Sequence, residues 1–145
     1  MRRKKSITPN PARRFLELIG LIFVKKEKGF SRSELTITDS LLNPYDTLHG
    51  GVVYSMADTG MGGALSTLLE EDELCSTLEI KINYLKSMRS GTLVCDTKVI
   101  HKGKSIAFLE SVVKNSEDNL VATATGTFNI FKISTPEKRP TSDTA

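Results

Sequence analysis

One stretch of the sequence, residues 52–69, has the pattern of a long helix, and it constrains the fold more than any other feature. Apolar and small residues recur there at steps of three and four, which places them on one side of a helix. Three interior glycines, Gly60, Gly62 and Gly63, interrupt the stretch. Each interior glycine lowers helix stability by roughly 1 kcal/mol relative to alanine. We therefore expect another element to approach this helix where a side chain would not fit.

The segments on both sides of the helix have the patterns of strands. In residues 77–84, Leu78, Ile80, Ile82 and Tyr84 alternate with polar residues, which predicts a strand with one buried face. A short helix is predicted from Pro11 to Ile19, because Asn10 suits its N-cap and Gly20 its C-terminal stop. The predicted strands are residues 21–26, 30–38, 77–84, 92–100, 105–114 and 120–131.

Short turns join most of these strands, and consecutive strands with short turns are antiparallel neighbours. One long helix on an antiparallel sheet is an α+β architecture. We expect one domain, residues 9–133, between a basic tail at residues 1–8 and a flexible tail at residues 134–145. Since one helix cannot cover such a sheet, the apolar, glycine-rich side of the helix invites a second copy of the chain.

Composition disfavours several classes of protein. The net charge is only +3, so we expect no nucleic-acid partner, and no segment approaches the ~20 apolar residues of a membrane span. Cys75 and Cys95 match no metal spacing and are expected to be free thiols of a cytoplasmic protein. The two histidines, His49 and His101, form no metal motif, and no Gly-x-Ser-x-Gly nucleophile motif occurs.

A candidate for chemistry remains at the predicted start of the long helix. His49-Gly50-Gly51 places free backbone N–H groups there, and these favour an anion or a polarised carbonyl oxygen. Asp58 lies two turns into a mostly apolar helix, where a carboxylate is costly unless it is paired, solvated or used. It is a candidate nucleophile or general base. Two plainer interpretations stay open: Asp58 faces solvent, and His49 only fixes the turn by a hydrogen bond.

Residues 43–131 resemble the PaaI and Them2-like acyl-CoA thioesterase branch of the hotdog superfamily. This resemblance implies a hotdog fold and hydrolysis of an acyl-CoA to free acid and coenzyme A, with no cofactor. It also implies that the Gly50 N–H polarises the thioester carbonyl with help from Asn43, that His49 shapes the loop, that Asp58 is the nucleophile or base, and that Thr77 positions water. The matching stretches are Asn43-Pro-Tyr-Asp-Thr-Leu-His-Gly-Gly-Val-Val-Tyr-Ser-Met-Ala-Asp58, Ile80-Lys-Ile-Asn-Tyr-Leu, Lys102-Gly-Lys-Ser-Ile-Ala-Phe and Ala122-Thr-Ala-Thr-Gly-Thr-Phe128.

Residues that hold the coenzyme A are implied by the same resemblance. The turn at residues 101–104 also has a physical basis for this role, because two lysines and exposed N–H groups can meet phosphates. A plain basic hairpin turn is the alternative. The implied residues are Tyr84, His101, Lys102, Gly103, Lys104, Ser105 and Asn129.

Helix geometry predicts that two chains share each active site. Gly50 and Asp58 are eight residues apart, which is ~12 Å along a helix, whereas both must lie about 3 Å from one thioester group. An antiparallel helix from a second copy solves this, and the resemblance implies the same arrangement, in a dimer or a tetramer. The alternative functions are a non-catalytic acyl-CoA-binding module and, with a different catalytic pair, a dehydratase.

Overall fold

The computed structural model describes residues 14–133, so the predicted tails and the Asn10 cap lie outside the described residues. Helix α1 is followed by two strands, a short 3-10 helix, the long helix α2 and four further strands. The elements are α1 (Arg14–Ile19), β1 (Leu21–Glu27), β2 (Phe30–Thr36), η2 (Asp39–Leu41), α2 (Gly50–Ser66), β3 (Glu73–Tyr84), β4 (Thr92–Lys102), β5 (Ile106–Asn115) and β6 (Leu120–Lys132).

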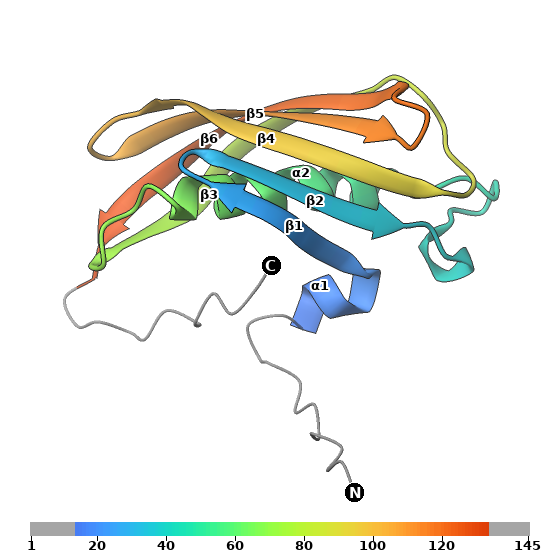
Figure 1. The fold of residues 1–145 in the computed structure, drawn as a ribbon, viewed down its shortest axis with the longest axis horizontal. Coiled ribbons are helices and arrows are strands. Elements are labelled where there is room, and N and C mark those ends of the chain that lie inside the picture. The colour runs from blue at the N-terminus through green and yellow to red at the C-terminus, as the bar shows by residue number, and fades with distance from the viewer. Residues whose placement is uncertain (1–13, 134–145) are drawn as a thin grey trace, which may run out of the picture.

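The six strands form one antiparallel sheet in the order β1-β2-β4-β5-β6-β3. Figure 1 shows this sheet curving over α2, which runs along its concave side. The structure thus confirms the predicted α+β architecture. It also places β3, the strand that follows the helix, at one edge of the sheet, where its outer side pairs with no other described strand.

The predicted elements largely coincide with the observed ones. Gly20 and Gly29 have φ angles of 76° and 74°, the left-handed conformation that stops α1 and turns β1 into β2. The prediction was wrong at both ends of α2, which begins at Gly50 and ends at Ser66 instead of covering residues 52–69. Thr67 explains the early end, because its hydroxyl donates to the Ala64 carbonyl and accepts from the Gly29 N–H.

Two of the three interior glycines of α2 are sites of close packing, as predicted. A Cβ at Gly60 would lie 2.7 Å from Thr97 Oγ1, and one at Gly63 would lie 2.6 Å from the Phe23 ring. Gly62 differs, because nothing lies within 4 Å of its hypothetical Cβ. Close packing therefore explains Gly60 and Gly63, while the structure gives no reason of this kind for Gly62.

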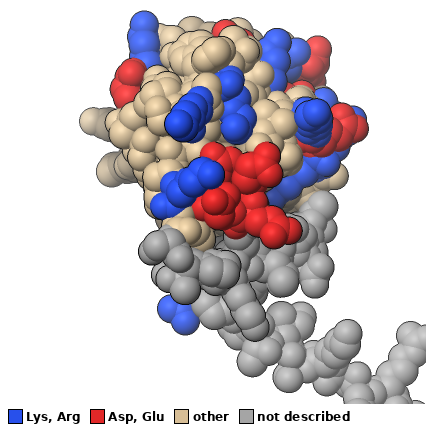
Figure 2. All heavy atoms as spheres, turned by 90° about the vertical axis from the view of Figure 1, so that its left-hand side faces the viewer, with Lys and Arg blue, Asp and Glu red and all other residues tan. Residues whose placement is uncertain are grey.

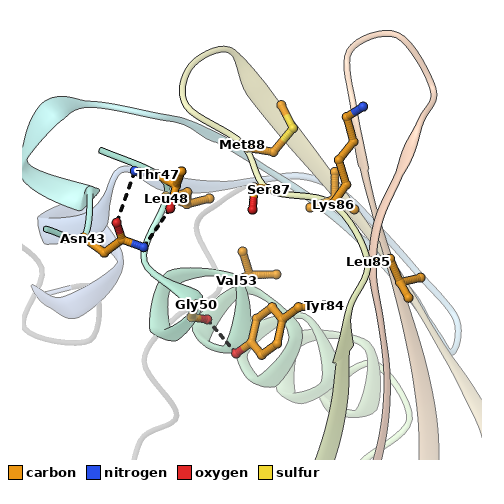
Figure 3. A pocket seen from close by; sticks show the side chains of 11 residues that line it. Asn43, Thr47, Leu48, Gly50, Val53, Tyr84, Leu85, Lys86, Ser87 and Met88 are labelled. Carbon is orange, nitrogen blue, oxygen red and sulfur yellow. Dashed lines mark hydrogen bonds between the residues drawn. The ribbon is translucent and has the colours of Figure 1, made fainter. Parts of the chain in front are cut away.

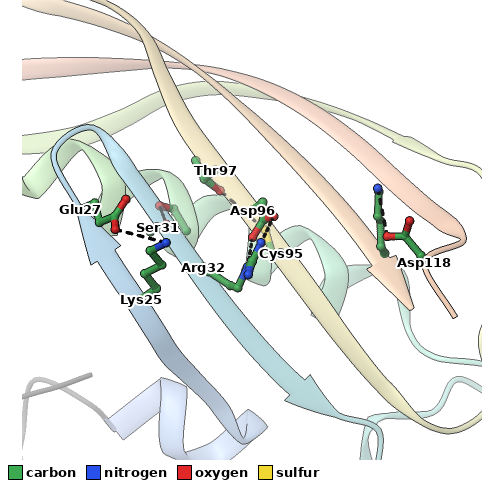
Figure 4. Close-up of polar contacts among 10 residues, drawn as sticks. Lys25, Glu27, Ser31, Arg32, Cys95, Asp96, Thr97 and Asp118 are labelled. Carbon is green, nitrogen blue, oxygen red and sulfur yellow. Dashed lines mark hydrogen bonds and ion pairs between the residues drawn. The ribbon is translucent and has the colours of Figure 1, made fainter. Parts of the chain in front are cut away.

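A small polar layer lies under the helix at Gly60 (Figure 4). The buried Ser31 hydroxyl donates to the Gly60 carbonyl over 2.7 Å, and the buried Thr97 and Ser111 hydroxyls lie 2.6 Å apart. These groups satisfy one another in a place where an unpaired hydroxyl would cost stability. The Ser31–Gly60 hydrogen bond and the close approach of Thr97 to Gly60 set the distance between α2 and the sheet.

Apolar side chains fill the remaining space between α2 and the sheet in two clusters. Val53 and Met56 belong to a cluster with residues of β1, β2 and β4, and Ala57 and Met61 to one with residues of β5 and β6. Side chains on two sides of α2 are thus buried against the sheet, and this packing holds the helix in place. Among residues 14–133, no helix has both the length and the apolar character needed to cross a lipid bilayer.

Candidate active site

The first turn of α2 contains a backbone N–H group without a hydrogen-bond acceptor among the described residues. His49 is the N-cap, and its Nδ1 accepts from the Gly51 N–H over 2.9 Å. The predicted turn-fixing hydrogen bond of His49 is therefore present. The Gly50 N–H, one residue earlier, has no acceptor among the described residues. A free N–H at the positive end of a helix dipole stabilises negative charge on a substrate oxygen.

Asn43 organises the loop that leads into this turn. Its amide nitrogen donates to Thr47 Oγ1 over 2.7 Å, and its amide oxygen accepts from the N–H groups of Tyr45 and Thr47. Both ends of the side chain are thus used within the loop. Because Asn43 also lines the neighbouring pocket, its loop contacts fix the wall of that pocket next to Gly50.

Asp58 and Thr77, predicted to act together, are in direct contact. The Thr77 hydroxyl donates to Asp58 Oδ1 over 2.6 Å. Asp58 is half-buried, and Oδ2, its other carboxylate oxygen, has no hydrogen-bond partner within residues 14–133. One oxygen is therefore held in place while the other is free to act on a substrate or a water molecule.

A β-bulge turns Thr77 toward Asp58. Thr77 pairs with Phe128 and Glu79 with Thr127, so Leu78 is an extra residue without a partner in β6. Since Phe128 is buried, Thr77 shares the helix-facing side with Ile80. The predicted strict alternation over residues 77–84 was wrong here: Leu78 is 59% exposed. Bulges near active sites re-aim side chains in this way.

Within one chain, the donor and the carboxylate are separated. Gly50 begins α2 and Asp58 lies eight residues further on, ~12 Å along the axis of a straight helix. One thioester group cannot touch both, because each contact must be about 3 Å long. The chain therefore carries two candidate half-sites, one at the first turn of α2 and the other in its middle.

A pocket of about 310 Å³ lies beside the first half-site, between the 43–48 loop, α2 and the chain that follows β3 (Figure 3). Both apolar and polar residues line it. The sequence patterns did not single out most of these residues, because they come from segments without a shared periodicity. They are Asn43, Thr47, Leu48, Gly50, Val53, Tyr84, Leu85, Lys86, Ser87, Met88 and Val121.

The residues implied for coenzyme A binding fall into two groups. His101, Lys102, Gly103, Lys104 and Ser105 lie at the β4–β5 turn, and Asn129 is paired with Ile106 beside it. Tyr84 is elsewhere. Asn129 pairs with Ser76, and Tyr84 lies eight positions further along β3, which is ~26 Å at about 3.3 Å per residue. Tyr84 instead joins the half-site of Gly50.

The charge around the β4–β5 turn is mixed. Figure 2 shows this end of the molecule, where Lys and Arg side chains lie beside a group of Asp and Glu side chains. The connection between α2 and β3 carries Glu70, Glu71 and Asp72, and Lys132 forms an ion pair with Asp72. Lys102 and Lys104 are exposed, and salt screens exposed charges over short distances. With acidic side chains nearby, their attraction for phosphates is confined to the turn itself.

Cys75 and Cys95 form no disulfide, as predicted. Burial raises the pKa of Cys95 to about 11, so this thiol is not a nucleophile near neutral pH. No group of three or more metal-ligand side chains comes together among the described residues.

Comparisons with known proteins identify the family. The model of the thioesterase superfamily matches residues 45–122, more than half of the chain. A 1,4-dihydroxy-2-naphthoyl-CoA hydrolase of Listeria monocytogenes is 30% identical over 116 residues, which cover 80% of this chain and 94% of that protein. The acyl-coenzyme A thioesterase PaaI of Escherichia coli is 27% identical over 107 residues, 72% of this chain and 73% of PaaI.

A solved structure supports the same assignment. A conserved protein from Pseudomonas aeruginosa superposes with a TM-score of 0.78 at 34% identity and covers 81% of this chain and 94% of that one. The resemblance that was inferred from the His-Gly-Gly to Asp58 stretch is therefore confirmed. The chain belongs to the thioesterase superfamily, in its PaaI-like branch with the hotdog fold, and is a thioester hydrolase.

Proposed function

We propose that the protein hydrolyses an acyl-CoA thioester to a free acid and coenzyme A. The observation that carries the proposal is the Thr77–Asp58 hydrogen bond of 2.6 Å, which leaves Asp58 Oδ2 without a partner among the described residues. The Gly50 N–H likewise has no acceptor among these residues. Two relatives whose names include a CoA thioester substrate support this class of substrate. Water is the second substrate, and no cofactor is required.

In the proposed reaction, the Gly50 N–H donates to the thioester carbonyl oxygen and stabilises the negative charge that develops there. Asp58 then acts by one of two routes. It attacks the carbonyl carbon and forms an anhydride that water hydrolyses, or it removes a proton from the water that attacks. In both routes the carbon–sulfur bond breaks, and the thiolate of coenzyme A leaves and takes up a proton. Thr77 holds the carboxylate and the attacking water in line.

We further propose that Gly50 and Asp58 of each active site come from two chains. In one chain they are ~12 Å apart along α2, and an antiparallel α2 from a second copy brings its Asp58 opposite this Gly50. The open edge of β3 supports this arrangement, because the same strand of a partner can continue the sheet there. A two-fold axis would then create two equivalent sites per dimer.

The pocket of about 310 Å³ next to Gly50 is proposed to receive the acyl group. Leu48, Val53, Met88 and Val121 give it apolar walls, which suit an acyl chain or ring. Lys102 and Lys104 are proposed to meet the phosphates of the coenzyme A.

A substrate panel tests the proposal. The purified protein is incubated with short, long and aromatic acyl-CoAs, and the released thiol is measured with a thiol reagent. We expect one thiol for each acid formed. Binding of acyl-CoAs without thiol release would instead favour the alternative, a non-catalytic acyl-CoA-binding module, and would contradict the proposed hydrolysis.

A further inference from the structure

Tyr84 reaches from the end of β3 to the first turn of α2. Its hydroxyl donates to the Gly50 carbonyl over 2.8 Å, across 34 residues of sequence (Figure 3). The ring lies close to the same residue, because a Cβ added at Gly50 would be 3.2 Å from Cζ. Partial burial raises the pKa of this phenol, so it remains a hydrogen-bond donor at neutral pH.

The Tyr84 hydroxyl and the His49 ring hold the same peptide group. The Gly50 carbonyl and the Gly51 N–H are the two ends of one planar unit. Tyr84 binds its oxygen over 2.8 Å, and His49 Nδ1 binds its hydrogen over 2.9 Å. This peptide is therefore fixed from both sides by two side chains, one local in sequence and one distant.

The two contacts explain why two glycines stand together. A Cβ at Gly50 would press on the Tyr84 ring, and a Cβ at Gly51 would lie 2.9 Å from His49 Nδ1. Glycine leaves room for both side chains, but it also makes the first turn of the helix easier to unwind. Unwinding would move the Gly50 N–H, whose direction depends on the peptide that follows it.

We propose that Tyr84 is a positioning residue for the oxyanion donor: it fixes the Gly50–Gly51 peptide so that the Gly50 N–H stays aimed at the thioester carbonyl. The inference rests on the proposed function of Gly50. It differs from the role that the family resemblance implies for Tyr84, which is contact with coenzyme A. The two roles predict different kinetics, because an oxyanion donor acts mainly in the transition state.

The variant Tyr84→Phe tests the proposal, because it removes the hydroxyl and keeps the ring. We expect kcat to fall roughly three- to tenfold, the effect of one lost hydrogen bond, with KM nearly unchanged. Tyr45→Phe is the matched control, since Tyr45 is 83% exposed in the preceding loop and should leave both constants unchanged. A rise in KM alone, or no change, would overturn the positioning role.

Amide hydrogen exchange gives a second readout that does not depend on turnover. In Tyr84→Phe we expect faster exchange at Gly51 and at the next residues of the first turn, and unchanged exchange in the middle of α2. Unchanged exchange at Gly51 would contradict the proposal. If the wild-type protein released no thiol from any acyl-CoA, the proposed function would fail, and exchange at Gly51 would still decide whether Tyr84 holds this peptide.

Discussion

The two half-sites of α2 are built in different ways. At the first turn, the proposed functional group is the Gly50 N–H, and two of the groups that shape it, the His49 ring and the Gly51 N–H, are its neighbours in sequence. In the middle of the helix, the proposed functional group is the Asp58 side chain, and its partner Thr77 comes from another element across 19 residues. The donor is thus shaped by its neighbours in sequence together with Tyr84 of β3, whereas the carboxylate is held only by a residue distant in sequence.

The two half-sites should therefore differ in how strongly amino-acid substitutions lower activity. A backbone donor survives most side-chain substitutions around it, because only the position of the peptide matters. A side-chain carboxylate is lost with a single substitution. We therefore expect larger losses of activity in the Asp58 half-site than in the Gly50 half-site.

The largest effect is expected from Asp58→Asn, which keeps the size of the side chain and removes its charge. Loss of a nucleophile or general base lowers kcat by roughly 10²–10⁴-fold. Asp118→Asn is a matched control, because Asp118 lies in the β5–β6 turn with a φ of 65°, a conformation that asparagine accepts. Thiol release measures both variants. A folded Asp58→Asn protein with the wild-type rate would show that Asp58 has no catalytic role.

Mixed dimers compare the two half-sites directly. Chains with Asp58→Asn are refolded together with chains carrying Asn43→Ala, which disturbs the loop at Gly50. In a mixed dimer with shared sites, one site receives both changes and the other receives neither. We expect activity up to half of the wild-type value per mixed dimer, which is more than half of the activity of the Asn43→Ala parent, because one site is intact. Verified mixed dimers without recovery would mean that each site lies within one chain.

Thr77→Ala should have a smaller effect than Asp58→Asn, because Thr77 orients the reacting groups and does not change its own bonds. We expect kcat to fall roughly tenfold, with recovery in Thr77→Ser, which restores a hydroxyl. Ser76→Ala is the control on the opposite face of β3, where Ser76 pairs with Asn129. A larger loss at Thr77 than at Asp58 would mean that the two roles are exchanged.

The smallest effect is expected at the β4–β5 turn, outside both half-sites. Lys102→Ala with Lys104→Ala should raise KM for acyl-CoAs a few-fold and leave kcat unchanged, because exposed charge pairs contribute little each. Pantetheine thioesters, which lack the nucleotide phosphates, should show no such rise. Lys98→Ala, an exposed lysine of the same strand β4, is the control. Equal effects on both substrates would exclude phosphate binding by this turn.

Sequence patterns predicted the elements well where the signal was local. Gly20 was predicted as the C-terminal stop of α1, and the strands predicted at residues 92–100, 105–114 and 120–131 have nearly the observed lengths of β4, β5 and β6. The start of α2 was placed two residues late, because glycine lowers helix propensity at Gly50 and Gly51. The N-cap hydrogen bond of His49 overrides that preference.

The β-bulge at Leu78 is a feature that sequence periodicity did not predict. Period-two alternation put Thr77 and Ile80 on opposite faces, but the extra residue places both on the side of α2. A bulge is decided by pairing with another strand, in this case β6, and no local property of the residues 77–84 indicates it. The family resemblance implied a role for Thr77, and the tertiary structure gave the geometry by which it meets Asp58.

By itself, the sequence determined the α+β architecture, the single long helix and the position of a backbone donor and a carboxylate along it. These follow from periodicity and from the conformational preferences of nearby residues, which act over a few positions. Only the tertiary structure decided that Thr77 holds Asp58, that Tyr84 holds the Gly50 peptide, and that Gly60 approaches Thr97. Each of these contacts joins residues 19 to 37 positions apart, and such contacts exist only after strands have paired and the helix has packed on them.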